Sequence, residues 1–158
     1  MDKWDVRFME MAQLVSTWTS CYTEGRAIGA VIVKDGEVIA TGVNRVTANN
    51  DPTAHAEVTA IRQACEKLGT FSLEGCDIYA SCEPCPMCLG AIYWARLDHL
   101  YYGANKHDAA AAGFDDQFIY EEIELPYANR HLKTASLLED EAQAPFTLWA
   151  QHEERVAY

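Results

Sequence analysis

Large apolar residues recur every three or four positions near the start of the chain, which is typical of one face of an amphipathic helix. They are Trp4, Phe8, Met11, Ala12, Val15 and Trp18, and they predict a packing helix over residues 2–23. Two mostly apolar runs follow, 27–34 and 37–43, separated by Asp35 and Gly36. Both of these residues tolerate the positive φ of a type I′ turn, so the pattern predicts a tight antiparallel hairpin.

Helical and strand patterns alternate along the middle of the chain. The expected elements are a loop over 44–51, a helix from the N-cap and first turn at Asp51 and Pro52 to Leu68, a strand over 76–81, an apolar helix over 89–96 and a strand over 98–103. Strand, helix and strand in this order imply a right-handed crossover and a parallel pair. We therefore predict an α/β fold, a three-layer α/β/α sandwich around a mixed central sheet.

The last third of the chain has weaker patterns. Helical segments are expected over 108–112, ending at Gly113, and over 115–123 and 145–158, whereas 133–138 is ambiguous and could form an edge strand. No internal repeat or low-complexity linker separates these segments. With 158 residues, 49% of them apolar, the chain is expected to form one domain that buries roughly 70% of its unfolded surface.

Charge narrows the range of partners. The formal net charge is −12, and no dense cluster of lysine and arginine interrupts the acidic balance, so we expect no nucleic-acid partner. There is no run of eighteen apolar residues, and the N-terminus lacks the basic and apolar regions of a signal peptide. We therefore expect no membrane association and a cytoplasmic location.

Residues 81–88 place three cysteines and two prolines in eight positions, which indicates half of a metal site. The other half lies upstream at 52–57, where a histidine and a glutamate follow a proline. Together the two stretches match H-x-E…P-C-x-x-C, the pattern of zinc deaminases. The spacing predicts His55, Cys85 and Cys88 as ligands of Zn²⁺, with a fourth position left for a water whose pKa the metal lowers toward about 7.

Glu57 is the candidate proton carrier of such a site. It would take a proton from water, pass it to a ring nitrogen and later protonate the departing amine. Residues two apart on an ideal helix point about 200° away from each other, so His55 and Glu57 can share a site only if His55 lies at the helix mouth.

Cys82 leaves the ligand assignment open, because Cys82 and Cys85 form a second C-x-x-C pair. With Cys82 as a fourth ligand, the site would be a closed structural zinc site rather than a catalytic one. The remaining cysteines, Cys21, Cys65 and Cys76, are expected to be buried apolar residues, since the cytosol keeps thiols reduced.

Three stretches, residues 51–62, 81–96 and 112–116, resemble the bacterial guanine deaminases of the cytidine deaminase superfamily. The tail 144–149, ending in Tyr158, is similar to theirs as well. The resemblance implies a zinc-dependent homodimer in which the segment 140–158 is exchanged between subunits, so that Tyr158 reaches the partner's ligand. Without the resemblance, Tyr158 would be read as a frayed terminus.

The resemblance further implies that Asn44 and the Ala56 backbone bind the base, that Trp94 lines its pocket, and that Asp116 binds substrate and moves protons. Each residue also has a plain interpretation. Asn44 is typical of a turn, Trp94 of a helix core, and Asp116 of a helix N-cap.

One position departs from the family. Guanine deaminases carry Pro-Phe-Gly before the first strand, whereas this chain has Ala27, Ile28 and Gly29. Ile28 can still pack on a flat ring, although losing an aromatic partner costs on the order of 1 kcal/mol. The first thirty residues look more like deoxycytidylate deaminases, so substrate choice stays open at this point.

Four functions remain. The leading hypothesis is hydrolytic deamination of a free nucleobase, with guanine as the favoured substrate. The second is a pyrimidine deaminase that acts on cytosine, cytidine or deoxycytidylate. The third is an adenosine deaminase of transfer RNA, which the acidic charge disfavours. The fourth is a zinc-stabilised binding module without catalytic activity.

Overall fold

The structure is a computed structural model that describes residues 5–22, 28–114 and 116–158, with the side chains of 18–22 also outside the description. Cys21 and Trp18 therefore lie outside the described side chains, and Ala27 outside the described residues. The chain divides into two compact units, Met1–Gln117 and Phe118–Tyr158, and each is described here by itself. No helix in the described ranges is long and apolar enough to cross a lipid bilayer.

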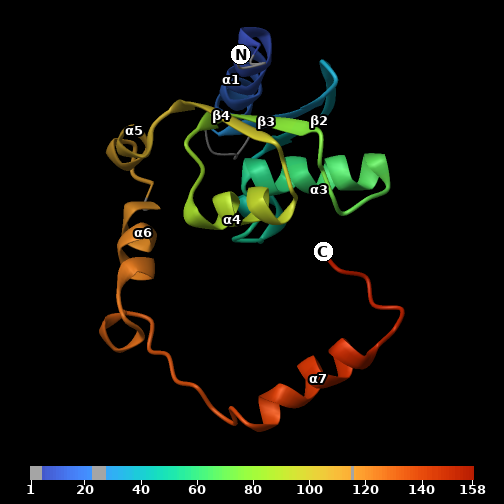
Figure 1. Ribbon diagram of the computed structural model, residues 1–158. Coiled ribbons are helices and arrows are strands. Elements are labelled where there is room, and N and C mark those ends of the chain that lie inside the picture. Colours follow the sequence, from blue (N-terminus) through green and yellow to red (C-terminus); the bar gives the residue numbers. More distant parts are fainter. Residues whose placement is uncertain (1–4, 23–27, 115) are drawn as a thin grey trace. The chain divides into compact units, whose positions relative to one another are not determined.

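A four-stranded mixed sheet in the order β2-β1-β3-β4 forms the centre of the first unit (Figure 1). Its strands are β1 (Gly29–Lys34), β2 (Glu37–Val43), β3 (Cys76–Cys82) and β4 (His99–Ala104). β1 pairs antiparallel with both β2 and β3, whereas β3 and β4 are parallel. The mixed sheet and its parallel pair are as the sequence predicts.

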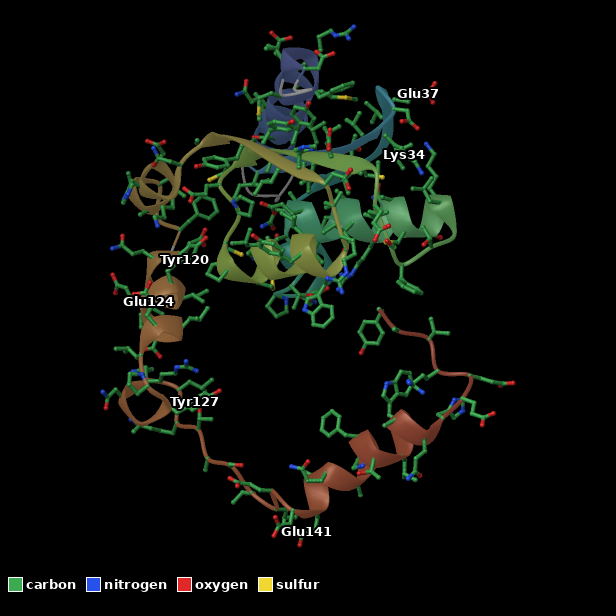
Figure 2. The ribbon with its side chains drawn as sticks, in the orientation of Figure 1. Lys34, Glu37, Tyr120, Glu124, Tyr127 and Glu141 are labelled. Carbon is green, nitrogen blue, oxygen red and sulfur yellow. The ribbon has the colours of Figure 1, made fainter. Side chains whose placement is uncertain are left out.

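The hairpin between β1 and β2 forms where Asp35 and Gly36 predict it. Their φ angles are 50° and 78°, the left-handed values that a type I′ turn requires. Lys34 pairs with Glu37 across the turn, and Figure 2 shows both side chains at this end of the hairpin. The register shifts between Ile32 and Val33, which marks a bulge in the ladder.

Helices cover both faces of the sheet, as expected for a three-layer sandwich (Figure 1). α1 (Val6–Tyr22) packs on one face, where Ala12 joins Val31, Val33 and Tyr79 in a buried cluster. α3 (Ala56–Leu68) and α4 (Pro86–Trp94) lie on the other face, over a cluster that includes Ala30, Ile32, Ala60, Ile78 and Ile92. Alternate residues of β1 thus point to opposite layers.

Two predicted boundaries are wrong near residues 52–57, the upstream half of the predicted metal site. The expected loop 44–51 contains a short helix, α2 (Val46–Asn49). The next helix begins at Ala56 rather than at Pro52, because Asp51 Oδ1 accepts from Thr53 N–H at 2.9 Å and from the Thr53 hydroxyl at 2.6 Å. These bonds close a turn at Asp51 that competes with the helix. The predicted end at Gly69 is confirmed, with a φ of 65°.

Three of the remaining described helices are shorter than or shifted from their predictions, and the two short 3₁₀-helices have no predicted counterpart. They are α5 (Lys106–Ala111), α6 (Asp116–Glu124), η1 (Tyr127–Asn129), η2 (Glu141–Gln143) and α7 (Ala144–Gln151). Residues 133–138 form neither helix nor strand, and the predicted helix over 145–158 stops at Gln151. The predicted start of α6 at Asp115 lies outside the described residues.

Arg130 makes hydrogen bonds and a ring contact in the turn after α6. Its guanidinium donates to the carbonyls of Leu125 and Ile123, each at 2.9 Å, and lies over the Tyr127 ring at 4.4 Å from its centroid. Figure 2 marks this stretch by Tyr120, Glu124 and Tyr127. Cationic donors suit the free carbonyls at a helix C-terminus, so Arg130 stabilises the end of α6.

Candidate metal and catalytic site

The three predicted metal ligands meet at the N-terminal ends of two helices. His55 is the N-cap of α3, with an extended backbone at φ −68° and ψ 161°, and Cys85 is the N-cap of α4. Cys88 lies in the first turn of α4. The predicted position of His55 at the helix mouth is therefore confirmed, and it removes the angular conflict between His55 and Glu57.

The separations between donor atoms fit one metal ion. His55 Nδ1 lies 3.6 Å from Cys85 Sγ and 3.5 Å from Cys88 Sγ, and all three donor atoms lie within 4.8 Å of one another. Zinc bonds of about 2.3 Å to sulfur and 2.0–2.1 Å to nitrogen at a tetrahedral angle place nitrogen and sulfur about 3.6 Å apart. One imidazole and two thiols at this spacing fit the three-ligand set of a catalytic zinc site.

The two thiols differ in their readiness to ionise. A hydrogen bond from the Cys88 side chain, helped by His55 and by the Cys88 N–H at 3.5 Å, lowers the pKa of Cys85 to about 4. The same pairing and burial raise the pKa of Cys88. Cys85 also raises the pKa of His55 through its side-chain hydrogen bond. A helix N-terminus favours thiolate, and a metal cation would favour it at both sulfurs.

Glu57 is buried beside this group, with 3% of its surface exposed. Burial raises the pKa of its carboxyl group, although hydrogen bonds to its own backbone and to the Cys88 side chain act in the opposite direction. A carboxyl group with a raised pKa can hold a proton and give it up near neutral pH, as a general acid and base must.

Cys82 lies in a different environment from Cys85 and Cys88. It is buried at the end of β3, and burial together with Glu57 and Asp116 raises its thiol pKa to about 11. The cluster of potential ligands in the described part of the chain contains His55, Cys85 and Cys88 and leaves Cys82 out. The Cys82 thiol therefore stays neutral and is suited to lining the site as a buried side chain rather than to binding the metal. Of the other cysteines, Cys76 is buried and Cys65 is partly buried, as expected.

Asn44 and Ile28 lie together at one end of the hairpin. Asn44 is buried, its N–H donates to the Ile28 carbonyl at 3.4 Å, and its Oδ1 accepts from Val46 N–H at 3.1 Å. The hydrogen bonds of the described residues leave the Asn44 Nδ2 hydrogens available to an acceptor. Ile28 packs against the cluster that contains Ala56, the residue after His55.

Ala56 and Asp116 are the two other residues predicted to act near the His55, Cys85 and Cys88 side chains. Ala56 is fully buried as the first residue of α3, where helix N–H groups have no acceptor within the helix. The negative charge of Asp116, at the start of α6, contributes to raising the pKa values of His55 and Cys82. The roles of both residues toward a substrate remain predictions.

Trp94 and Tyr158 are both exposed side chains. Trp94 is the last residue of α4, away from the turn that holds Cys88, and is 64% exposed, with Arg96 lying 5.9 Å from its ring centroid. Tyr158 is 74% exposed and belongs to the second compact unit. Their roles toward a substrate remain predictions.

Sequence reasoning missed Glu83, which stabilises the loop between β3 and α4. Its Oε2 accepts from Lys106 N–H at 2.8 Å, and its own N–H donates to the Ala104 carbonyl at 2.7 Å. The cysteine-bearing loop is thereby tied to the start of α5. A glutamate between Cys82 and Pro84 is a signal that could have drawn attention to this link, but its partner is distant in sequence.

Comparisons with known proteins agree with this geometry. Residues 2–104 match the family model described as the cytidine and deoxycytidylate deaminase zinc-binding region. A guanine deaminase from Bacillus subtilis is 54% identical over 134 residues, which cover 85% of this chain and 86% of that protein. A tRNA-specific adenosine deaminase from Agrobacterium fabrum is 52% identical over 104 residues, covering 66% of this chain and 68% of that protein.

Solved structures extend the likeness to the whole chain. The crystal structure of guanine deaminase from Bacillus subtilis matches with a TM-score of 0.94 and 48% identity, covering 100% of this chain and 99% of that one. Guanine deaminase from Nitrosomonas europaea matches with a TM-score of 0.66 and 31% identity, covering 69% of this chain and 63% of that one.

Proposed function

Because the chain belongs to the cytidine and deoxycytidylate deaminase family, we propose that it is a zinc-dependent guanine deaminase that converts guanine and water to xanthine and ammonia. The observation that carries the chemistry is the meeting of His55, Cys85 and Cys88 beside buried Glu57. The observation that carries the substrate is the likeness to guanine deaminases over nearly the entire chain.

His55, Cys85 and Cys88 would hold the Zn²⁺ cofactor, which lowers the pKa of water and supplies the nucleophile. Glu57 accepts the first proton as water adds to the ring carbon that bears the amino group, and passes it to the adjacent ring nitrogen. It then carries the second proton from the added oxygen to the amino group. The carbon–nitrogen bond breaks, and ammonia leaves.

The other site residues hold the base. The Asn44 side-chain amide and the Ala56 N–H are donors suited to the guanine carbonyl and ring nitrogens, and Ile28 offers an apolar surface to the ring. Asp116 would accept from the exocyclic amine and assist its protonation. Trp94 and, from a second subunit, Tyr158 are proposed to close the pocket.

We also propose a homodimer with exchanged C-terminal segments. Its support is the family likeness and the apolar character of α7, where Phe146 is 73% exposed, Leu148 68% and Trp149 49%. Such a surface is typical of an interaction site. A cytoplasmic location is proposed as well, since ionised cysteines serve as metal ligands only where they stay reduced.

A substrate panel tests the function. The zinc-loaded protein is expected to release ammonia from guanine, and more slowly or not at all from adenine, cytosine and deoxycytidylate. Turnover of a pyrimidine without turnover of guanine would refute the proposal and favour the pyrimidine alternative.

Replacing the proton carrier separates catalysis from structure. Glu57→Gln is expected to lower kcat on guanine by about 10²–10⁴-fold while the zinc content, measured by metal analysis, stays at that of the native protein. Full zinc content with unchanged kcat would contradict the role of Glu57, and loss of the metal would indicate a structural role instead.

A further inference from the structure

A cavity of about 420 Å³ lies in the first unit, between α1, the ends of β3 and β4, and α5. Side chains that line it include Ser16, Thr17, Ile28, Ser81, Cys82 and Asp108. None of the proposed metal ligands lines it, and neither does Glu57. The cavity therefore does not include the metal group itself, and its volume would hold a sugar ring or a small heterocycle.

Ile28 and Cys82 belong both to the lining of the cavity and to the surroundings of the metal site. Ile28 lines the cavity and also packs against the cluster that contains Ala56, next to His55. Cys82 lines the cavity, and the charges of Glu57 and Asp116 act on its thiol. A base that packs against Ile28, as proposed above, would therefore border the cavity.

The polar groups of the cavity offer both donors and acceptors. Ser81 Oγ accepts from Gly29 N–H at 3.0 Å, and no hydrogen bond among the described residues uses the Ser81 hydroxyl proton. The Thr17 hydroxyl donates to the Gln13 carbonyl at 2.9 Å, so its lone pairs can accept. Asp108 Oδ2 accepts from Asn105 N–H at 2.9 Å, and the carboxylate keeps further acceptor sites.

The charges of the described residues that line the cavity disfavour phosphate. Asp108 contributes a carboxylate, and the lining residues that belong to the described ranges include no lysine, arginine or histidine. A phosphate would meet a like charge without a compensating cation. Neighbouring donors and acceptors without positive charge match a neutral group that carries hydroxyls.

We propose that this cavity receives a hydroxylated substituent on the purine ring, so that the enzyme deaminates guanosine as well as guanine but rejects guanosine phosphates. The proposal rests on the proposed deamination of guanine at the Glu57 site. Guanine would leave the cavity to solvent, whereas the ribose of guanosine would place its hydroxyls against Ser81, Thr17 and Asp108.

Kinetics of the zinc-loaded native enzyme on guanine, 9-methylguanine, guanosine and guanosine 5′-monophosphate test the proposal. Guanosine is expected to be turned over, with kcat/KM at least about tenfold above that of the monophosphate. Turnover of guanine without turnover of guanosine would overturn the cavity proposal alone, whether or not guanosine inhibits. Turnover of 9-methylguanine but not guanosine would also overturn it. Failure on guanine itself would refute the proposed function.

A filling variant locates the effect. Ala112 lines the cavity, and Ala112→Leu is expected to lower kcat/KM for guanosine by about tenfold or more, with less than a twofold change for guanine. Ala110→Leu is the matched control, because Ala110 is exposed on α5 and does not line the cavity. Equal effects of Ala112→Leu on both substrates, or equal effects of the two variants on guanosine, would overturn the proposal.

Discussion

Glu57 is both a buried side chain and the proposed proton carrier. With 3% of its surface exposed, it has lost most of the water that would stabilise its charge. A natural protein keeps an ionisable group in such a place at a cost to stability, and pKa shifts of this kind cluster at functional sites. The carboxyl group proposed to serve catalysis is therefore expected to destabilise the metal-free fold.

The pH dependence of stability follows from this shift. The folded-state pKa of Glu57 is raised above the ordinary glutamate value of 4.5, so the neutral form favours folding. This contribution is fully present below the unfolded pKa and is lost as pH rises through the folded pKa. Metal-free Glu57→Gln is thus expected to exceed the native chain at pH 8 by about 1 kcal/mol or more in free energy of unfolding.

Urea unfolding of both metal-free proteins over a pH series measures this difference, which should close toward pH 4.5. Glu66→Gln serves as the control, because Glu66 is an exposed residue of the same helix. A difference that is absent at pH 8 or grows on acidification would contradict the electrostatic explanation.

At this scale the sequence predicted much of the site. His55, Cys85 and Cys88 were found from spacing, and the need for His55 and Glu57 to share a site predicted the helix mouth. The sequence could not predict the link from Glu83 to Lys106 N–H or the position of Cys82 beside Ile28. The first depends on the parallel pairing of β3 with β4, and the second on the antiparallel pairing of β1 with β3.

Among the elements, the contact between β2 and α3 is the tightest constraint on the site. A Cβ atom on Gly42 would collide with the Ala56 carbonyl oxygen and lie 2.6 Å from Ala60 N, both of them backbone atoms of α3. Only glycine lets the helix approach the strand this closely. Ala56 follows His55, so this approach fixes the height of the metal ligand above the sheet.

Gly42→Ala is therefore expected to lower the free energy of unfolding by about 2–4 kcal/mol and to weaken zinc binding, because α3 must move away from the sheet. Denaturant unfolding and competition with a zinc-binding dye measure the two effects.

Gly90→Ala in α4 is the comparison, since a Cβ there meets nothing within 4 Å. It should stabilise the helix by about 0.5–1 kcal/mol. Similar losses in the two variants would contradict the steric argument.

Local signals explain which elements were predicted well. Asp35 and Gly36 encode their turn with two adjacent residues, and Gly69 marks the end of α3 in the same way. Asp51 and Pro52 misled the prediction because an N-cap and a tight turn use the same residue types, and the choice depends on the hydrogen bonds to Thr53. The tail has no comparable end signal, so its helix was extended past Gln151.

For the whole molecule, the second compact unit leaves large apolar side chains of α7 exposed in the single chain. The proposed exchange would bury them against another subunit and bring Tyr158 to the partner's site. Deleting Tyr158 is then expected to lower kcat/KM on guanine by about tenfold or more without dissociating the dimer, as measured by kinetics and light scattering.

Mixed dimers give a sharper test of the exchange. A Glu57→Gln subunit has an intact tail, and a subunit lacking Tyr158 has an intact Glu57. Refolding the two together should restore activity above that of either variant, because one site then has both groups. Activity equal to the average of the two parents would contradict exchange.

A metal ion held by His55, Cys85 and Cys88 would also close a loop in the chain. His55 is separated from Cys85 by 30 positions and from Cys88 by 33, so a shared ion would act as a reversible cross-link between the starts of α3 and α4. Cross-links of this kind reduce the entropy of the unfolded ensemble, and the two helices cannot separate while the ion is bound. Zinc availability during synthesis would then govern how much of the newly made chain escapes aggregation and proteolysis.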